Sequence, residues 1–299
     1  MTPMRADNLT EVSAPLDAQA MRIETLLAAG QAALERAGGD APRLQAELLL
    51  AHVLSQPRSY LMAHAEAFIP QSAAASYRAL LERAACGEPT AYLIGEREFW
   101  SLALEVSPAV LVPRPETERL VERALSLIDA AAGRCICDLG TGSGAIALAL
   151  AVERPEWQIT ATDCSSAALE LARRNAHRHG LHRVEFLQGD WFAPLGARRF
   201  HLLASNPPYV AAGDPALLRL RHEPHIALTP GHAGTEALQH IVVEAPHYLL
   251  PGGWLVLEHA GGQGAVLSGW LQQRGYAHIH CHRDYAAIER VTEAQWPGA

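Results

Sequence analysis

The first third of the chain carries the apolar spacing of amphipathic helices. Residues 20–86 are rich in Ala and Leu, and apolar residues recur every three or four positions in the segments MRIETLLAAGQAALERAG, APRLQAELLLAHVLSQ and PQSAAASYRALLERAACG. The breaks GGDAP, QPRS and FIPQS separate these segments with residues that stop helices. The pattern therefore predicts a small bundle of helices, each of which buries one apolar stripe.

The pattern then changes to that of strands. Residues 87–115 alternate in EREFWSLALEV and continue into three prolines, which predicts a hairpin or an extended linker. From about residue 116, helical and strand patterns alternate. The predicted helices contain ETERLVERAL, GAIALALAV, SSAALELARR, TEALQHIVVE and GAVLSGWLQQ, and the predicted strands contain CICDLG, WQITATD, VEFLQGD, FHLLAS, GGWLVLEHA, AHIHCHRDY and IERVTEAQW. Such alternation predicts a mostly parallel sheet covered on both faces, in which ligands bind at the carboxyl ends of the strands.

Length and charge narrow the class of protein. The 299 residues suffice for two domains, and no apolar run reaches the length of about 18 residues that a membrane-spanning helix needs. The first residues lack the apolar core of a secretory signal, so we expect a cytoplasmic protein whose N-terminus is a loose arm. Lys and Arg total 24 against 32 Asp and Glu, a balance of −8 that disfavours general binding to a phosphate backbone.

The cysteines and histidines do not predict a metal site. The five cysteines are scattered, and we expect them to be reduced thiols that pack mostly in core strands. Cys135 and Cys137 form a Cys-X-Cys pair without a second pair to complete a zinc site. The 15 histidines lack a suitably spaced carboxylate or thiol partner, so solvated surface imidazoles are the simpler interpretation.

A glycine-rich turn follows the first core strand of the alternating region. Gly140, Gly142 and Gly144 separate CICDL from a helical segment, which would bring backbone N–H groups close to a ligand. Asp163 ends the next strand, where its carboxylate could accept hydrogen bonds from both ribose hydroxyls of a nucleoside. By spacing alone a dinucleotide site fits as well, and so does a turn without a ligand. Asp138 favours a different ligand, because it would repel pyrophosphate but attract, directly or through water, the amino group of an amino acid.

The third strand ends in LQGDW. At this position Asp190 could accept a hydrogen bond from the exocyclic amine of an adenine, and Trp191 could pack on its ring. The alternative is that Trp191 is an ordinary core residue.

The fourth strand stops at the segment NPPY, residues 206–209, because neither proline can donate a hydrogen bond to a sheet. The side-chain oxygen of Asn206 and the carbonyl of Pro207 could accept the two N–H bonds of a planar NH2 group. The two prolines fix the backbone in advance, and Tyr209 could lie against the flat amide. These dipoles would stabilise positive charge that develops on the nitrogen during methyl transfer. The same four residues also suit the exocyclic amines of nucleobases.

Taken together, these motifs resemble the bacterial release factor glutamine methyltransferase family. The resemblance covers about residues 20–292 and rests on GEREFWSLALEVSPAVLVPRPETE, DLGTGSGAIALALA, QGDWF and SNPPYV, with HEPHIALTPGHAG, LEHAGGQ and RDYAAIERV in support. It implies the α/β fold of class I S-adenosylmethionine-dependent methyltransferases, a Rossmann-like seven-stranded sheet, with a small N-terminal helical bundle. It also implies transfer of the methyl group of S-adenosyl-L-methionine to N5 of the glutamine in the Gly-Gly-Gln loop of peptide-chain release factors.

The resemblance assigns roles to individual residues. Asn206, Pro207 and Tyr209 are expected to act in catalysis, and Pro208 joins them in binding the substrate glutamine. Phe99, Arg114 and Glu116 are expected to border the substrate channel. The residues expected at the cofactor are Gly140, Thr141, Gly142, Ser143, Gly144, Asp163, Asp190, Trp191 and Asn206.

The same reasoning divides the chain into segments with expected partners. We predict a disordered arm over residues 1–18, a substrate-docking helical domain over 19–88, a hairpin or linker over 89–115 and a methyltransferase domain over 116–299. The expected partner is a release factor, and we expect a monomer that binds neither membrane nor nucleic acid. The chain departs from the family pattern near residues 229–236, which are less acidic, and at RDYAA.

Other functions stay open at this point. They are methylation of a glutamine in a large-subunit ribosomal protein, methylation of an exocyclic amine in nucleic acid, and a non-enzymatic role as a cofactor-binding adaptor. Gly261, Gly262 and Gln263 also spell the tripeptide of the expected substrate, which raises self-methylation of Gln263 as a hypothesis. A loop that opens a helix is the simpler interpretation of this tripeptide.

Overall fold

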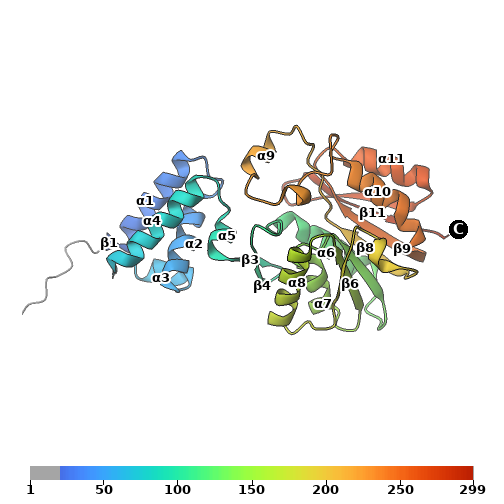
Figure 1. Ribbon diagram of the computed structural model, residues 1–299, viewed down its shortest axis with the longest axis horizontal. Coiled ribbons are helices and arrows are strands. Elements are labelled where there is room, and N and C mark those ends of the chain that lie inside the picture. Colours follow the sequence, from blue (N-terminus) through green and yellow to red (C-terminus); the bar gives the residue numbers. More distant parts are fainter. Residues whose placement is uncertain (1–20, 299) are drawn as a thin grey trace, which may run out of the picture. The chain divides into compact units, whose positions relative to one another are not determined.

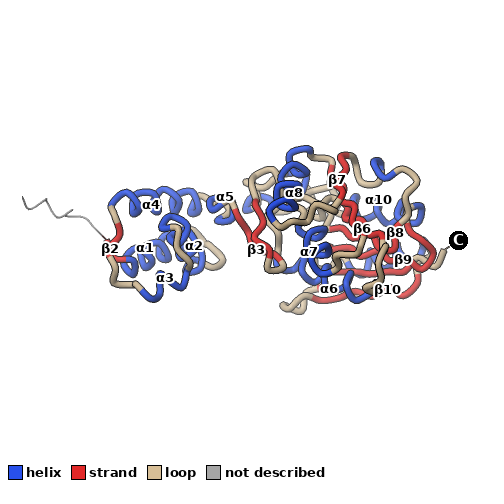
Figure 2. Tube along the Cα trace, turned by 90° about the horizontal axis from the view of Figure 1, so that it is seen from below, coloured by secondary structure: helices blue, strands red, loops and turns tan. Residues whose placement is uncertain are grey.

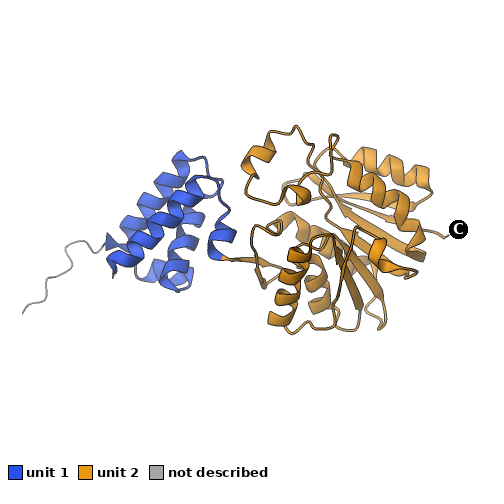
Figure 3. Cartoon of the chain, viewed as in Figure 1, with its two compact units in different colours: residues 1–94 blue, residues 95–299 orange. Residues whose placement is uncertain are grey.

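A computed structural model describes residues 21–298, so the predicted arm over residues 1–18 lies outside the described residues. The chain divides into two compact units, Met1–Ile94 and Gly95–Ala299 (Figure 3). The division falls within the stretch 89–115 for which the sequence predicts a hairpin or linker. No helix within residues 21–298 has both the length and the apolar character that crossing a membrane requires.

The first unit is a helical bundle (Figure 2). Its helices are α1 (Ile23–Arg36), α2 (Pro42–Leu54), α3 (Arg58–Ala63), α4 (Gln71–Ala85) and α5 (Thr90–Ile94), and a small antiparallel pair joins β1 (Met21–Arg22) to β2 (Phe68–Ile69). The three predicted helices correspond to α1, α2 and α4, whereas α3, α5 and the strand pair have no separate signal in the sequence.

One glycine allows α1 and α4 to approach closely. A Cβ atom on Gly30 would lie 2.1 Å from the hydroxyl oxygen of Tyr77, whose side chain is fully buried in the core of the bundle. The helices therefore meet at a position that only glycine can occupy without a shift.

The second unit is built on a seven-stranded sheet (Figure 1). The strands are β5 (Cys135–Leu139), β6 (Gln158–Asp163), β7 (Glu185–Gln188), β8 (Phe200–Ser205), β9 (Leu249–Glu258), β10 (Ala277–Arg283) and β11 (Glu289–Gln295). Their order is β10-β11-β9-β8-β5-β6-β7, with β5 to β9 parallel and β11 antiparallel to both neighbours. The predicted fold class, a seven-stranded α/β sheet with an N-terminal helical bundle, is confirmed.

Helices cover both faces of this sheet (Figure 1). The helices of the unit are α6 (Glu118–Leu127), α7 (Ala145–Glu153), α8 (Ser166–Arg178), α9 (Ala216–Arg219), α10 (Glu236–Glu244) and α11 (Gly264–Arg274). Side chains alternate along the strands: Ile136 packs with α6 and α7, and its neighbour Cys137 packs with α10 and α11. Both faces are therefore buried, as the alternation of strand and helix patterns predicts.

The segment before α6 forms the predicted hairpin. Its strands β3 (Glu96–Phe99) and β4 (Leu102–Glu105) are antiparallel, and Trp100 and Ser101 turn the chain with φ of 51° and 58°. Two successive residues in the left-handed region make the tight turn that suits the twist of a hairpin.

The expectation that the cysteines pack mostly in core strands is wrong. Cys137 is buried in β5, but Cys86, Cys164 and Cys281 are exposed and Cys135 is partly exposed. Cys86 and Cys164 lie just beyond the ends of α4 and β6, where a hydrophobic segment in the sequence gives way to a surface loop.

Candidate active site

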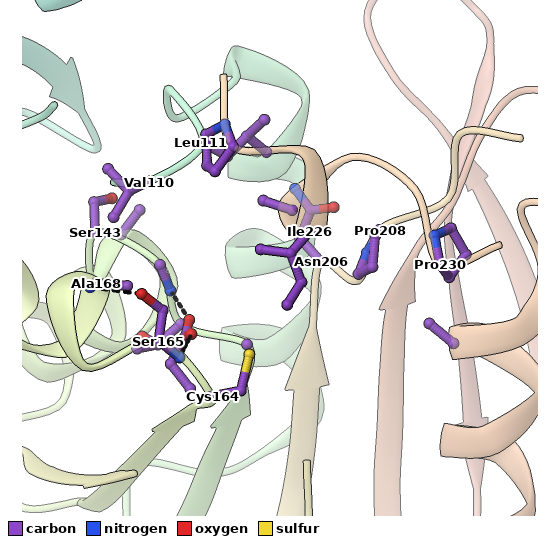
Figure 4. A pocket seen from close by; sticks show the side chains of 18 of the residues that line it. Val110, Leu111, Ser143, Cys164, Ser165, Ala168, Asn206, Pro208, Ile226 and Pro230 are labelled. Carbon is purple, nitrogen blue, oxygen red and sulfur yellow. Dashed lines mark hydrogen bonds between the residues drawn. The ribbon is translucent and has the colours of Figure 1, made fainter. Parts of the chain in front are cut away.

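A cavity of about 420 Å³ lies at the carboxyl ends of the central strands of the second unit. Figure 4 shows Ser143 and Ser165 on one side of it and Asn206 and Pro208 on the other. The two sides come together because β5 lies between β6 and β8 in the sheet, so the segments that follow these strands converge at one edge.

The glycine turn after β5 forms one wall. Gly140 and Gly142 have φ of 73° and 57°, and both line the cavity together with Thr141 and Ser143. Gly144 also has positive φ, 87°, but it does not line the cavity. A Cβ atom there would lie 3.3 Å from that of Ala172, so this glycine is needed for close packing of α7 against α8.

The carboxylate of Asp138, which the sequence predicts to attract a ligand amino group directly or through water, is bonded by the glycine turn and the start of α7. It is fully buried and does not line the cavity. Its Oδ2 accepts hydrogen bonds from the Thr141 hydroxyl at 2.6 Å and from the backbone N–H of Ala147 at 3.3 Å. Burial raises the pKa of this carboxyl to about 7, against the lowering effect of these two bonds. The structure therefore gives Asp138 the role of holding the glycine turn against the start of α7.

Asp163 ties the glycine turn to the start of α8. Its two carboxylate oxygens accept the backbone N–H groups of Gly142 and Ser165, each at 2.9 Å. Burial raises the pKa of the carboxyl, and the two N–H groups oppose the rise. Asp163 lines the cavity, and each of its oxygens has a further lone pair for a ligand hydroxyl.

Asp190 and Trp191 line the cavity after β7. Trp191 has φ of 43°, which is costly for a bulky residue, and its carbonyl accepts the Thr162 hydroxyl at 3.0 Å. Its ring packs 3.5 Å from the position of a Cβ on Gly140. Trp191 also packs against a core cluster, so it belongs both to the core and to the cavity wall.

The NPPY segment follows β8, and its residues differ in placement. Asn206 and Pro208 line the cavity, whereas Pro207 is buried and Tyr209 does not line it. The side-chain nitrogen of Asn206 donates a hydrogen bond to the Thr117 hydroxyl at 3.1 Å. The Tyr209 hydroxyl donates to the carboxylate of Glu258 at 3.2 Å.

The segment between the hairpin and α6 forms another part of the wall. Arg114 lines the cavity and forms an ion pair with Glu223, which also accepts the backbone N–H of Val112 at 3.0 Å. Glu116 does not line the cavity, and Phe99 is buried in the core below the hairpin.

Several residues that shape the site have no signal in the sequence. Gln263 is one: its side-chain nitrogen donates to the carbonyls of Tyr209 and Gly234, at 3.2 and 3.1 Å. Its oxygen accepts the backbone N–H of Ala260 at 2.9 Å. Gln263 thus holds the end of the NPPY segment in place. The glutamine of the Gly261-Gly262-Gln263 tripeptide therefore has a structural role, and we call its three hydrogen bonds the clamp. Gln263 lies in the loop after β9, and NPPY follows the neighbouring strand β8, so this contact depends on a strand order that the sequence does not give.

No metal centre accompanies the site in the described part of the chain. Within residues 21–298, no group of three or more His, Cys, Asp or Glu side chains is arranged to hold a metal ion.

The two units match known families separately. Residues 25–95 match the family described as PrmC N-terminal domain, and residues 120–222 match the methyltransferase small domain. The release factor glutamine methyltransferase of Vibrio cholerae is 48% identical over 280 residues, which is 92% of this chain and 96% of that protein. The protein of the same name from Pseudomonas aeruginosa is 46% identical and covers 85% of this chain and 92% of its own length.

The chain belongs to the release factor glutamine methyltransferase family.

Solved structures agree on the fold of the second unit. A methyltransferase from Pyrococcus furiosus aligns with a TM-score of 0.50 and 21% identity, over 66% of this chain and 90% of its own. The 16S rRNA N2 G1207 methyltransferase of T. thermophilus, solved with AdoMet and guanosine, aligns with a TM-score of 0.51 and 19% identity, over 67% of this chain and 49% of its own. At these identities the likeness establishes the class I methyltransferase fold alone.

S-adenosyl-L-methionine is the methyl donor of this methyltransferase. The cavity suits this cofactor chemically. Its wall combines the backbone N–H groups of the glycine turn, the Asp163 carboxylate for ribose hydroxyls and the flat ring of Trp191.

Proposed function

We propose that this chain transfers the methyl group of S-adenosyl-L-methionine to the side-chain nitrogen, N5, of the glutamine in the Gly-Gly-Gln loop of release factors. One observation carries the proposal: Asn206 lines the same cavity as Asp163 and the glycine turn. The side-chain amide of Asn206, the proposed hydrogen-bond acceptor for the substrate glutamine, therefore lies in one cavity with groups that suit a nucleoside.

The residues proposed to hold the cofactor surround one side of the cavity. They are Gly140, Thr141, Gly142, Ser143, Asp163, Asp190 and Trp191, with Gly144 acting through the shape of the turn. When bound, the cofactor supplies a methyl group on a positively charged sulfur.

The NPPY segment is proposed to orient the substrate amide. Because the Asn206 nitrogen donates to Thr117, the side-chain oxygen is the end of the amide that can accept a substrate N–H. The buried ring of Pro207 fixes its own backbone, and its carbonyl is proposed to accept the second N–H. Pro208 shapes the wall. Tyr209 is proposed to support the plane of the amide from a ring that Glu258 anchors. Such fixed dipoles stabilise the charge that develops on nitrogen without reorganising.

The proposed partner and setting follow from this activity. The first unit is proposed to dock the release factor, since residues 25–95 match the PrmC N-terminal domain. We further propose a cytoplasmic monomer that binds no nucleic acid directly. The net charge of −8 supports the last point.

Methyl transfer from labelled cofactor tests the function. Purified release factor should be labelled, and a release factor with alanine in place of the loop glutamine should not. Labelling of both proteins, or of neither, would contradict the assignment. Parallel assays with ribosomal proteins and with RNA separate the two alternative substrate classes, and preferential labelling of either would replace the proposal.

A further inference from the structure

Two segments outside the sheet complete the wall of the cavity. Residues 109–114 lie between the hairpin and α6, and residues 210–231 follow the NPPY segment. Both segments contribute lining side chains, among them Val110, Leu111 and Arg114 from the first and Pro224, Ile226 and Thr229 from the second (Figure 4). The shape of the cavity therefore depends on how these two segments are held together.

The second segment is a closed loop, which we call the entrance loop (residues 210–231). Its ends meet through two backbone hydrogen bonds, from the N–H of Val210 to the carbonyl of Leu228 at 2.9 Å and from the N–H of Ala212 to the carbonyl of Gly231 at 3.0 Å. Ile226 lines the cavity although it is 63% exposed, so it lies at the cavity mouth. The entrance loop therefore forms part of the opening through which a substrate side chain must pass.

One carboxylate joins the entrance loop to residues 109–114. Glu223 belongs to the loop and is 7% exposed. Its Oε2 accepts the backbone N–H of Val112 at 3.0 Å, and its Oε1 accepts a hydrogen bond from the guanidinium of Arg114. Val112 is itself buried, so removal of the carboxylate would take away the acceptor of a buried N–H group. The bond to Arg114 joins two opposite charges, which makes it one of the stronger kinds of hydrogen bond.

We propose that Glu223 is a positioning residue: its carboxylate holds the entrance loop against residues 109–114 and so keeps the cavity mouth in the shape that admits the substrate glutamine. This inference rests on the proposed function, because it concerns the way in which the cavity receives that glutamine.

The proposal predicts a particular kinetic signature. A cavity wall that is already ordered costs less entropy to bind against. Without the carboxylate, the loop would take several arrangements, and the apparent affinity for the substrate would fall with the fraction of molecules whose mouth is still open in the right shape. A saturating substrate restores that arrangement. The KM for the release factor should therefore rise while kcat is nearly retained.

Turnover of the full-length chain, with release factor as substrate and saturating S-adenosyl-L-methionine, tests this signature. Glu223→Gln keeps an oxygen for the N–H of Val112 but loses the charge that pairs with Arg114, and it should raise KM by about threefold to tenfold. Glu223→Ala removes both bonds and should raise KM by about tenfold to thirtyfold, with kcat within about threefold of wild type.

Hydrogen–deuterium exchange followed by mass spectrometry measures the loop directly, without any substrate. In Glu223→Ala, the amides of residues 210–231 and of Val112 should exchange about tenfold faster than in the wild-type chain. Glu293→Gln is the matched control for Glu223→Gln, since Glu293 is also buried and pairs with an arginine, Arg123, but does not line the cavity. This control should lower the free energy of unfolding and change neither KM nor exchange in the entrance loop.

The outcomes separate this inference from the function itself. A wild-type chain that does not methylate release factor would refute the function, and the exchange experiment would still test the link between the two segments. With an active wild-type chain, an unchanged KM in Glu223→Ala, or a loss confined to kcat, would overturn the positioning role. Equal exchange of the entrance loop in wild type and Glu223→Ala would overturn it as well.

A variant that fails to fold does not remove the test. If Glu223→Ala cannot be purified, Glu223→Gln and its control decide. A raised KM in Glu223→Gln alone supports the positioning role, and equal KM values in Glu223→Gln and Glu293→Gln overturn it.

Discussion

Replacing Gln263 with alanine tests whether its amide holds the NPPY segment in place. The side chain makes three hydrogen bonds, one from Ala260 and two to the carbonyls of Tyr209 and Gly234. At about 1 kcal/mol net for each bond, the loss would be about 3 kcal/mol. Because Gln263 is only partly buried, water can replace some of these bonds, and we expect a loss of about 1.5–3 kcal/mol.

Urea unfolding followed by far-UV circular dichroism measures this free energy, and single-turnover methylation measures the effect on the site. Gln263→Ala should lower kcat by about tenfold, because the carbonyl of Tyr209 loses the group that fixes it. Gln295→Ala is a suitable control, since Gln295 also donates its side-chain nitrogen to a carbonyl, that of Gly252 at 2.9 Å. This control should cost at most about 1 kcal/mol and leave turnover unchanged.

The clamp would be refuted if Gln263→Ala matched Gln295→Ala in both stability and turnover.

Intact-mass measurement of the wild-type chain after incubation with cofactor alone addresses the hypothesis of self-methylation. Because both N–H bonds of Gln263 are engaged by carbonyls, no gain of one methyl mass is expected.

Three further changes test the role of Asn206, the cofactor site and the packing of the first unit. Asn206→Ala should abolish turnover while leaving cofactor affinity, measured by calorimetry, nearly intact; a comparable loss of both would give Asn206 another role. Asp163→Ala should weaken cofactor binding by at least tenfold, since it removes the ribose acceptor and releases Gly142, and unchanged affinity would exclude this role. Gly30→Ala should lower the stability of the first unit by about 1–3 kcal/mol through overpacking against Tyr77. Adding Tyr77→Phe should restore part of that loss in thermal melts, because the Tyr77 hydroxyl is buried without a partner within residues 21–298; no recovery would contradict the steric explanation.

Local patterns in the sequence are sufficient for the seven strands of the large sheet and the longer helices, but not for α3, α5, α9 or the pair β1–β2. Alternation along CICDL and the repeats of apolar residues in the helices specify burial, because side chains in a strand or helix repeat with a known period. Glycines at 140 and 142 and the two prolines after Asn206 mark strand ends for reasons of backbone geometry alone. The cavity-lining residues Asp163, Asp190, Trp191 and Asn206 can be predicted from the sequence because each lies at the carboxyl end of a strand or within a few residues after it.

The tertiary structure alone decided how these strand ends are supported. Asn206 bonds Thr117 from 89 residues away, Tyr209 bonds Glu258 from 49, and Gln263 reaches Tyr209 from 54. Such pairs leave no periodic signal, since a single side chain at the end of one strand meets another only after the sheet has set their order. The tertiary structure also shows that Asp138 is fully buried and that its Oδ2 accepts the Thr141 hydroxyl and the backbone N–H of Ala147. The interaction with a ligand amino group that the sequence predicts for this carboxylate, directly or through water, stays a prediction.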